Sequence, residues 1–352
     1  MKKYILFLIG ILLNGTVQAQ DLDEVIRFIK ENPKKASFYL IEDGKTVVNF
    51  NSQQQMPLAS AVKTIIAIEF AKQSSLKKIS PITKIAVKDL DRYYIPNTDG
   101  GAQPNWLKSI GKTSADSVDL LEVAKGMIRY SSNANTEFLL DILGLANVNK
   151  NLKKLGFKAH QPLFYFTASA LMVCLKPKGI DEDNWIKELG SMSVADYNKK
   201  CEEAHQRLKA EPFYIKQFNS ANLSLNIQRV WSDRLVSSTT EDYAQLMQKI
   251  ASRKFFTPET QSVLESIMEW PMDFAGNKAQ FFHLGQKGGS TSFVLTDALY
   301  ASPKNGNQLA CCFFFNKLTE SESVLIKKNF GALEGNILTN ATFRNKLSEA
   351  LK

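Results

Sequence analysis

The residues best suited to chemistry in this sequence are a serine and a lysine three positions apart. Ser60 and Lys63 stand in the segment PLASAVKTIIAIEFAKQ, residues 57–73, where a polar turn leads into an apolar helix pattern. Residues three apart share one helix face, so the lysine amine can reach the serine hydroxyl. A serine becomes a strong nucleophile when a base takes its proton, and lysine is such a base once burial or another cation lowers its pKa. The pair therefore indicates either a nucleophile with its own base or a plain helix start with one snorkelling lysine.

The Ser-x-x-Lys spacing alone decides nothing, because it occurs four times in the chain. The match at Ser60 is the one that heads an apolar helix after a predicted strand hairpin. The other three lie in a polar helix end or in a loop: Ser74/Lys77, Ser75/Lys78 and Ser109/Lys112. A helix start also offers backbone N–H groups to an oxyanion that develops during acyl transfer. Context thus favours Ser60 and Lys63 over the other pairs.

A second candidate is the Ser-x-Asn pattern in YSSNANTEFLL, at a turn between two apolar helices. Ser131 offers a hydroxyl that can relay a proton, and Asn133 offers an amide that can hold a substrate carbonyl. Helix capping is the alternative explanation, because the pattern is not unique. It recurs at Ser220/Asn222 and Ser224/Asn226. The position between two apolar helices is what favours Ser131 and Asn133.

The third candidate is the segment QKGGST, residues 286–291. Lys287 is expected to end one strand, and Ser290 and Thr291 are expected to begin the next. Glycines allow a ligand to approach a strand backbone closely, so Gly289, Ser290 and Thr291 are candidate substrate contacts. Lys287 adds a second cation able to lower the pKa of Lys63. The alternative is an ordinary glycine-rich hairpin with an exposed lysine.

Hydrophobic spacing predicts the elements that must position these residues. A first helix is expected over residues 22–32, and the turn Asp43-Gly44 indicates a hairpin of two strands within residues 36–51. Further helices are expected at 118–130, with Ser117 as the cap, and at 136–143, 238–251, 257–268 and 343–352. Strands are expected within 279–289, 291–302 and 307–316, and a loop over 89–113.

Strands at both ends of the chain and helices in its middle predict an α/β (α+β) fold. The simplest packing joins all strands in one antiparallel sheet of about five strands, flanked by the terminal helices, with an all-α lobe. We expect a sheet lobe at about 20–58 and 270–352 and a helical lobe at about 59–269. Residues 156–235 follow no clear pattern and are expected to form an insertion or lid. A cleft between the lobes is the natural place for a site.

The first residues have the pattern of a cleavable signal peptide. Lys2 and Lys3 precede the apolar run YILFLIGILL, and Val17 and Ala19 supply small residues for cleavage near Ala19. Residues 1–19 are therefore expected to be removed. No later apolar run is long enough to span a bilayer. The remainder, residues 20–352, is expected to be one catalytic domain, periplasmic or secreted, and a monomer.

The charge, histidine and cysteine content argues against several functions. The formal net charge is +9, but its lysines are spread in pairs without an Arg-rich block, which argues against nucleic-acid binding. The three histidines are too scattered for a metal centre or a Ser-His-Asp triad, so no cofactor or metal is expected. Export permits Cys174 and Cys201 to pair, whereas Cys311 and Cys312 are strand neighbours and are expected to be buried thiols.

In this order, the three patterns resemble those of the penicillin-recognising serine enzymes, and of the class A β-lactamase group in particular. The resemblance extends over most of the mature chain and implies a β-lactamase/transpeptidase-like fold. It also implies that Ser60 is the acylated nucleophile, that Lys63 is its general base, and that Ser131 passes the proton to the leaving group. Any serine chemistry would then proceed without histidine.

The resemblance also implies the groups that bind the substrate. Asn133 would hold its side-chain amide or carbonyl, and Lys287 would contribute positive field. The backbone N–H groups of Ser60 and Ser290 would form the oxyanion hole. The expected substrate is a small molecule or a cell-wall-derived group containing a β-lactam or a related amide or ester.

Three departures from the class A pattern qualify this expectation. The deacylating glutamate, in a Glu-x-x-Leu-Asn pattern, is not found within residues 156–235. Gly288 stands where the family has a hydroxyl residue after the lysine, and Leu295 stands where it has an arginine. The last two changes remove charge-assisted hydrogen bonds to a substrate carboxylate, each worth about 1.5–3 kcal/mol. The acids available to replace the glutamate are Glu182, Glu188, Glu202 and Glu211.

Two functions therefore follow from the sequence. The first is an exported, β-lactamase-like serine hydrolase that forms an acyl-enzyme on Ser60 and acts on a β-lactam or a related amide or ester; an ester or amide without the usual carboxylate would explain all three departures. The second is a penicillin-binding sensor, in which the acyl-enzyme forms and persists because no deacylating carboxylate is identified. Turnover distinguishes the two.

Overall fold

The computed structural model describes residues 19–96, 98–211 and 213–352, and they fall into two compact units. The helical unit comprises residues 62–152 and 162–236, and the sheet unit comprises residues 19–61, 153–161 and 237–352. The predicted signal peptide, except for its last residue, lies outside the described residues. In the described ranges, none of the helices has both the length and the hydropathy needed to cross a bilayer.

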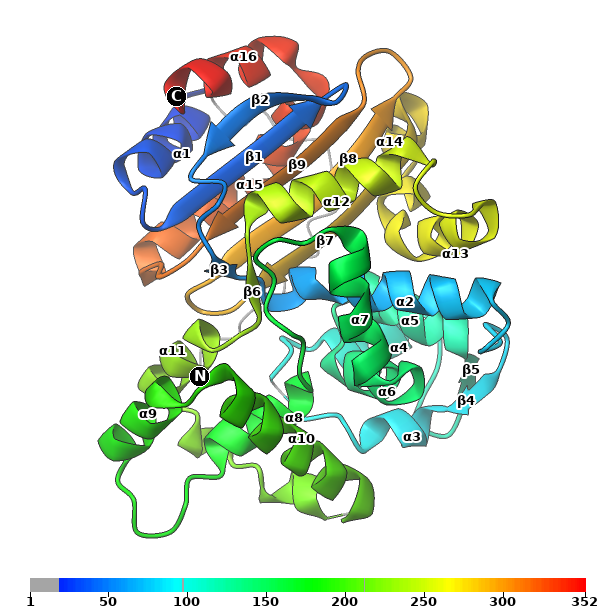
Figure 1. The fold of residues 1–352 in the computed structure, drawn as a ribbon, viewed down its shortest axis with the longest axis vertical. Helices are drawn as coiled ribbons and strands as arrows, with labels where there is room; N and C mark the ends of the chain where they lie inside the picture. Colours follow the sequence, from blue (N-terminus) through cyan, green and yellow to red (C-terminus); the bar gives the residue numbers. More distant parts are fainter. Residues whose placement is uncertain (1–18, 97, 212) are drawn as a thin grey trace. The chain divides into compact units, whose positions relative to one another are not determined.

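The sheet unit is built on one antiparallel sheet of five strands (Figure 1). Its order is β2-β1-β9-β8-β7, with bounds Lys45–Phe50, Ala36–Glu42, Leu309–Phe315, Leu295–Pro303 and Phe281–Ser290. The predicted hairpin at Asp43-Gly44 is confirmed, since both residues adopt the positive φ that its tight turn requires. The predicted sheet and fold class are therefore confirmed. Strand β1, from the first part of the sequence, is hydrogen-bonded to β9, from its last part.

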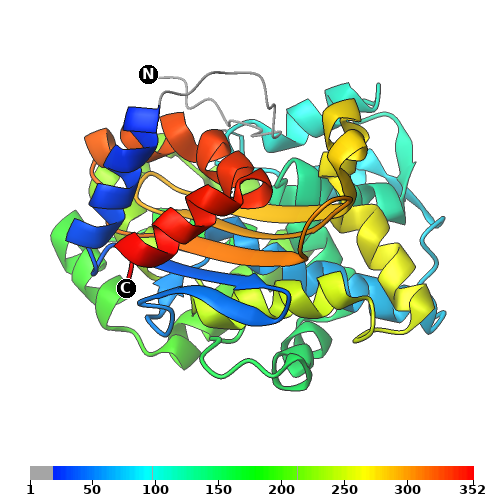
Figure 2. The ribbon, with the colours of Figure 1, turned by 90° about the horizontal axis from the view of Figure 1, so that it is seen from above.

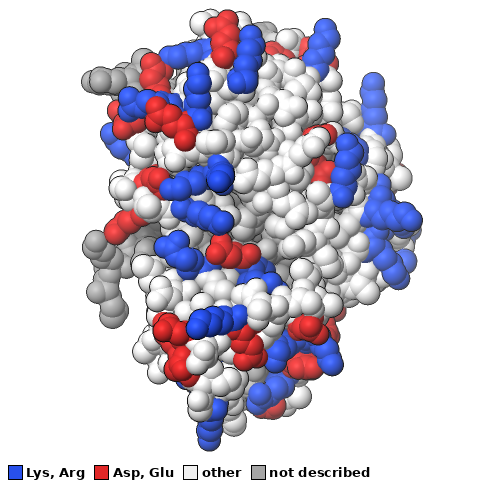
Figure 3. Space-filling model, turned by 60° about the vertical axis from the view of Figure 1, so that its left-hand side comes forward, with Lys and Arg blue, Asp and Glu red and all other residues white. Residues whose placement is uncertain are grey.

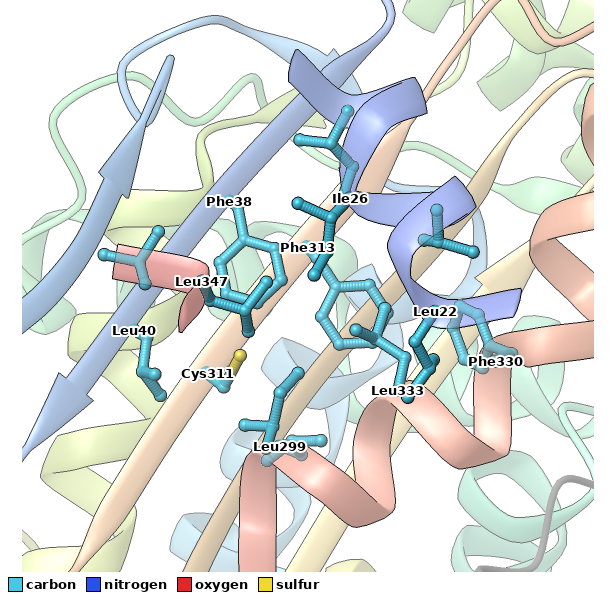
Figure 4. Packing of buried hydrophobic residues seen from close by; sticks show 14 of the residues in the cluster. Leu22, Ile26, Phe38, Leu40, Leu299, Cys311, Phe313, Phe330, Leu333 and Leu347 are labelled. Carbon is cyan, nitrogen blue, oxygen red and sulfur yellow. The ribbon is translucent and has the colours of Figure 1, made fainter. Parts of the chain in front are cut away.

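One face of this sheet is covered by the terminal helices (Figure 2). These are α1 (Ala19–Glu31), α15 (Glu320–Thr339) and α16 (Ala341–Ala350). Phe38 and Phe313 lie opposite each other in register, with ring centroids 5.5 Å apart. Figure 4 shows side chains of the helices meeting these strand residues, among them Leu22, Ile26, Phe330, Leu333 and Leu347. Burial of this apolar face is what holds the two ends of the chain together.

The other elements of the sheet unit lie between the hairpin and the C-terminal strands in the sequence. Helix α12 (Thr240–Ser252) packs on β1, β8 and β9, and β3 (Met56–Pro57) pairs with β6 (Ser237–Ser238). The remaining helices are α13 (Pro258–Met268), η4 (Trp270–Asp273) and α14 (Ala275–Gln280). Two predicted limits were wrong. Residues 279–280 end α14, and β7 continues through Lys287 to Ser290, so Thr291 lies in the turn before β8.

The first part of the helical unit is built mainly of short helices, of which α6 (Asn133–Leu143) begins at a side-chain cap, Ser132. It contains α2 (Lys63–Ser75), α3 (Val87–Asp91), α4 (Ala102–Ser109), α5 (Leu120–Arg129) and α6, followed by α7 (Leu145–Leu155), which continues past residue 152. Two expectations were wrong here. The predicted loop over residues 89–113 contains α4, and Ser117 lies in β5 (Ser117–Asp119), which pairs with β4 (Lys84–Ala86), instead of capping α5.

The segment 156–235, which the sequence left without a clear pattern, is mostly helical. It contains α8 (Phe166–Cys174), α9 (Glu182–Ser191), α10 (Val194–Ala210), η2 (Tyr214–Gln217), η3 (Ser220–Asn222) and α11 (Leu225–Asp233). All nine residues of α8 are buried, which explains why no amphipathic period is visible in its sequence.

The four cysteines are all buried free thiols. Cys174 and Cys201, for which a disulfide was open from the sequence, are therefore not bonded to each other. Burial raises the pKa of Cys174 to about 12 and that of Cys201 well above its ordinary value. Because the thiolate is the reactive form, these cysteines behave as small apolar side chains.

Candidate active site

The predicted site residues fall into two groups, one in each unit. In the helical unit, Lys63 opens α2, and its side chain is buried, with 1% exposed. Its Nζ donates to the backbone oxygen of Ser131 at 2.7 Å and to Oδ1 of Asn133 at 2.8 Å, and lies 3.4 Å from the Ser131 hydroxyl. Ser131 and Asn133 lie 68 and 70 positions after Lys63 in the sequence, and in the folded chain both accept hydrogen bonds from its amine. The lysine is not the snorkelling side chain of the alternative interpretation.

The turn that contains Ser131 is strained, and several hydrogen bonds stabilise it. Ser131 has φ +67°, a left-handed conformation that costs a non-glycine residue about 1–2 kcal/mol. Ser132 caps α6 by accepting from the backbone N–H of Asn135, and its hydroxyl donates to Oε1 of Gln103 at 2.5 Å. The Thr136 hydroxyl donates to the Ser132 carbonyl. These bonds compensate for the strain and keep the Ser131 carbonyl directed at Lys63.

Sequence reasoning missed the residues that support this turn from α4. Oδ1 of Asp99 accepts from the backbone N–H groups of Gly101 and Ala102, and Oδ2 accepts from that of Gln103. Burial raises the pKa of Asp99, although the N–H of Gln103 and the charge of Lys63 lower it. The signal was present in the sequence DGGAQP, because an aspartate before a helix turn with proline is a typical cap.

In the sheet unit, Ser60 lies in the single turn η1 (Ala59–Val62) that precedes α2. Strand β7 passes so close to this turn that a Cβ at Gly289 would lie 2.4 Å from the Ser60 nitrogen and 2.7 Å from the Leu58 oxygen. The Thr296 hydroxyl, from β8, donates to the same Leu58 oxygen at 2.8 Å. The sequence predicted that a ligand approaches the strand backbone at these glycines, whereas the close neighbour of Gly289 in the structure is the Ser60 backbone.

Lys287 is almost fully buried on β7, and its Nζ donates to the Gly288 carbonyl at 2.6 Å. Burial lowers the pKa of Lys287 to about 7, against the opposing attraction of Asp297. Lys287 is thus not the exposed lysine of an ordinary hairpin. The Lys287 amine can therefore gain or lose a proton near neutral pH.

Two buried acids near this strand were not found from the sequence. The side-chain amide of Gln286 donates to Asp297 Oδ2 at 3.1 Å and to Glu334 Oε1 at 2.7 Å. Burial raises the pKa of Asp297 to about 7 and that of Glu334 well above its ordinary value. Because the acids come from a strand and from the C-terminal helix α15, nothing in the local pattern links them.

The hydroxyl of Thr291 stabilises the turn that follows β7. Oγ1 of Thr291 accepts from the backbone N–H groups of Phe293 and Val294, each at 3.1 Å, so it is engaged within the turn. Ser290, in contrast, is exposed at the end of β7. Leu295 packs in the apolar core of the sheet. At the position where the class A pattern has an arginine, β8 therefore carries a buried leucine and no cation.

Among the described residues, one group has the side chains to hold a metal ion: Glu265, Glu269 and His283. An arginine already interacts with two of its members. Arg253 Nε lies 2.7 Å from Glu265 Oε1, and its Nη1 lies 3.1 Å from His283 Nε2. The guanidinium thus supplies the positive charge that a metal would bring, and we assign no metal role to this group.

A comparison with protein-family models decides the family. The model Beta-lactamase2, described as the Beta-lactamase enzyme family, matches residues 18–332. The chain belongs to this β-lactamase family. Comparison with curated protein sequences gives no significant match.

Solved structures with the same fold include β-lactamases and a protein named PBP-A. A class A β-lactamase from Bacteroides cellulosilyticus DSM 14838 has TM-score 0.52 and 16% identity over 94% of this chain and 96% of that one. A β-lactamase from Sphaerobacter thermophilus DSM 20745 has TM-score 0.56 and 15% identity over 91% and 98%. A mutant of PBP-A, as its acyl-enzyme complex with penicillin G, has TM-score 0.52 and 17% identity over 90% and 97%.

The four glutamates considered as replacements for the deacylating base do not show the surroundings of such a base. Glu182 accepts from the Ser224 hydroxyl, Glu202 from the Gln206 amide, and Glu211 from Arg207. Glu188 is half-buried on α9. These bonds tie three of the side chains to their own segment and offer no support for a role as the deacylating base.

Proposed function

We propose that this member of the β-lactamase family is an exported serine hydrolase that forms an acyl-enzyme on Ser60, with residues 20–352 acting as one catalytic domain. The observation that carries the proposal is the set of hydrogen bonds from the buried Lys63 amine to Ser131 and Asn133. Burial removes the water that stabilises an ammonium ion, which is the condition under which a lysine can serve as a base.

In the proposed reaction, the Lys63 amine takes the proton of the Ser60 hydroxyl, and Oγ bonds to the acyl carbon of the substrate. The Ser131 hydroxyl gives its proton to the leaving nitrogen or oxygen as the bond of that atom to the acyl carbon breaks, and it takes a proton back from Lys63, whose amine is then neutral again. The backbone N–H groups of Ser60 and Ser290 stabilise the oxyanion. Water then adds to the acyl carbon, and the Ser60 oxygen leaves as a hydroxyl, so that the acid is released and the enzyme is restored.

We further propose that the substrate is a β-lactam or a related amide or ester, small or derived from the cell wall, that does not depend on a carboxylate anchor. Gly288 offers no hydroxyl and Leu295 is buried in the core. Lys287 is a cation on β7 that could attract an anionic substrate, and its pKa of about 7 makes its charge depend on pH. Asn133 and Ser290 would supply neutral hydrogen bonds to the substrate.

A second candidate, a penicillin-binding sensor with a persistent acyl-enzyme, is favoured by one specific observation. The carboxylates Glu182, Glu202 and Glu211 are engaged within the segment where the class A pattern has its deacylating glutamate. In the sensor, acylation of Ser60 is itself the signal. Continued turnover separates the hydrolase from this alternative.

The test is hydrolysis of nitrocefin and of a p-nitrophenyl ester by purified mature protein. We expect steady turnover of at least one of them by the wild type and none above background by Ser60→Ala. The matched control is Ser75→Ala, which removes the serine of another Ser-x-x-Lys pair and is expected to behave as wild type. A burst that stops at one equivalent would establish the sensor. Equal turnover by Ser60→Ala would reject the nucleophile.

A further inference from the structure

The helix α8 is attached by its N-terminus to the helix that carries Asn133. The backbone N–H groups of Thr167 and Ala168 donate to the carboxylate of Glu137, at 2.9 and 3.1 Å. Glu137 lies on α6, one turn after Asn133, and is fully buried. A carboxylate at a helix N-terminus binds the free N–H groups and the positive end of the helix dipole. Glu137 therefore fixes where the first turn of α8 lies.

Glu137 is held on its other side by a buried histidine. Nδ1 of His205, from α10, lies 3.0 Å from Glu137 Oε1, and its ring stacks on Tyr165 with centroids 3.5 Å apart. Burial lowers the pKa of His205, but hydrogen bonds to Asp141 and Glu137 outweigh it and raise the pKa to about 9. His205 is thus a cation at neutral pH. Glu137, bonded to this cation and to two N–H groups, is not free to act as a base.

This arrangement brings one hydroxyl of α8 to the Lys63 group. Oγ1 of Thr167 donates to the backbone oxygen of Asn133 at 3.5 Å, and Thr167 is 3% exposed. The side chain of the same Asn133 accepts from Lys63 at 2.8 Å. Thr167, Asn133 and Lys63 thus form a continuous polar path within the helical unit. In the segment that lacks the glutamate pattern, it is a threonine that contacts the residue holding the lysine.

We propose that Thr167 is the positioning residue for hydrolysis of the acyl-enzyme, acting through Asn133 on Lys63. This inference rests on the proposed function. In the deacylation step, the Lys63 amine takes a proton from the attacking water, the water oxygen bonds to the acyl carbon, and the bond from that carbon to Ser60 Oγ breaks. The proton then passes from Lys63 to the Ser60 oxygen. Thr167 keeps Asn133 and the amine in place for this step, without a carboxylate.

Asp99 is the rival candidate, because its carboxylate lies close enough to Lys63 to interact with its charge. Both of its oxygens, however, accept from backbone N–H groups at the start of α4. These bonds hold both oxygens at the start of α4, although burial raises the pKa of the carboxyl. We therefore assign the positioning role to Thr167, and Asp99 enters the experiment as a competitor.

The test separates the rate of acylation from the rate of deacylation. Rapid-quench intact-mass measurements with penicillin G or a p-nitrophenyl ester follow the adduct as it forms and decays. We expect Thr167→Val to form and to lose the adduct about tenfold more slowly than the wild type, because Lys63 is the proposed base of both steps, while Thr167→Ser retains the wild-type rates. The matched control is Ser169→Ala, on the same helix, whose hydroxyl bonds Phe166 and Trp231 and is not part of the path.

Three outcomes overturn the proposal. Equal adduct lifetimes in the wild type and in Thr167→Val show that the hydroxyl plays no part, although Ser60 is acylated. A longer lifetime in Asp99→Asn together with an unchanged lifetime in Thr167→Val assigns the step to Asp99. Absence of any adduct on the wild type removes the proposed function, and this inference with it. A merely structural role, in which the side chain only fills space, would instead be retained by Thr167→Val and lost in Thr167→Ser.

Discussion

Gly289 is a residue at which the neighbouring backbone leaves little room for a side chain. A Cβ there would lie 2.4 Å from the Ser60 nitrogen, 2.7 Å from the Leu58 oxygen and 2.8 Å from the Thr296 hydroxyl. The first two atoms belong to the backbone and the third is held in a buried hydrogen bond, so none of them can move aside without displacing β7. If the Ser60 N–H binds the oxyanion, its position depends on this glycine.

The first prediction concerns this contact. Gly289→Ala is expected to displace the Ser60 turn from β7 and to lower the rate of acylation at least about 100-fold, the usual cost of losing an oxyanion donor. The control is Gly276→Ala, in the same unit, where an added Cβ meets nothing within 4 Å. The measurement is the rate of adduct formation, with circular dichroism to establish folding. A wild-type rate in Gly289→Ala would contradict this role of the strand.

Some residues of the candidate site were accessible to sequence reasoning and others were not. Ser131, Asn133 and Lys63 were predicted to act together because each stands at an element boundary in a known order, and their hydrogen bonds agree with that. Asp297 and Glu334 were not predictable, since they come from a strand and from a helix that meet only in the folded sheet unit. Long-range pairs of this kind leave no local pattern.

At the scale of elements, α6, α8 and α10 are joined by a buried ion pair. His205 of α10 lies between two carboxylates of α6, Glu137 at 3.0 Å and Asp141 at 3.4 Å. Breaking a buried pair by removing one partner destabilises a protein strongly, because a charge is left without compensation. The position of α8, and of Thr167 with it, is therefore linked to the charge of His205.

The second prediction follows from this linkage. The pKa of His205 is raised from 6.5 to about 9, so its contribution to folding is fully present below pH 6.5 and is lost as the pH rises through about 9. Denaturant unfolding at about pH 6 and about pH 10 is expected to show a loss on the order of 2 kcal/mol that His205→Gln lacks.

The control for this prediction is His160→Gln in the sheet unit. Burial lowers the pKa of His160 to about 4, so this histidine is neutral throughout the same pH range. The variant is expected to keep the wild-type dependence on pH. Equal slopes in the wild type and in His205→Gln would show that His205 carries no charge in the folded protein.

The elements also show where sequence patterns are informative. The hairpin of β1 and β2 was predictable because Asp43-Gly44 is a strong turn signal between two apolar runs. Helix α4 was missed because two glycines and a proline near its start favour a loop, whereas the Asp99 cap compensates for them. Helix α8 was missed because it is buried on every side. Caps and complete burial thus account for these errors.

For the whole molecule, the formal net charge is +9, yet the cations do not stand apart from the acids on the surface in view (Figure 3). Figure 3 shows Lys and Arg side chains interspersed with Asp and Glu on the face in view. Several of the cations are paired, such as Lys35 with Glu322 at 2.7 Å and Lys209 with Asp141 at 2.8 Å. Opposite charges thus lie close together on this face (Figure 3).

The central claim, that Ser60 becomes acylated, is tested most directly by locating a penicillin adduct. Intact-mass measurement of the mature protein followed by tryptic peptide mapping would place the added mass on residues 46–63, a peptide that contains both Ser52 and Ser60. The account predicts one adduct, on Ser60, and none on the Ser60→Ala variant. An adduct on Ser52, on another peptide, or of equal amount on Ser60→Ala would contradict it.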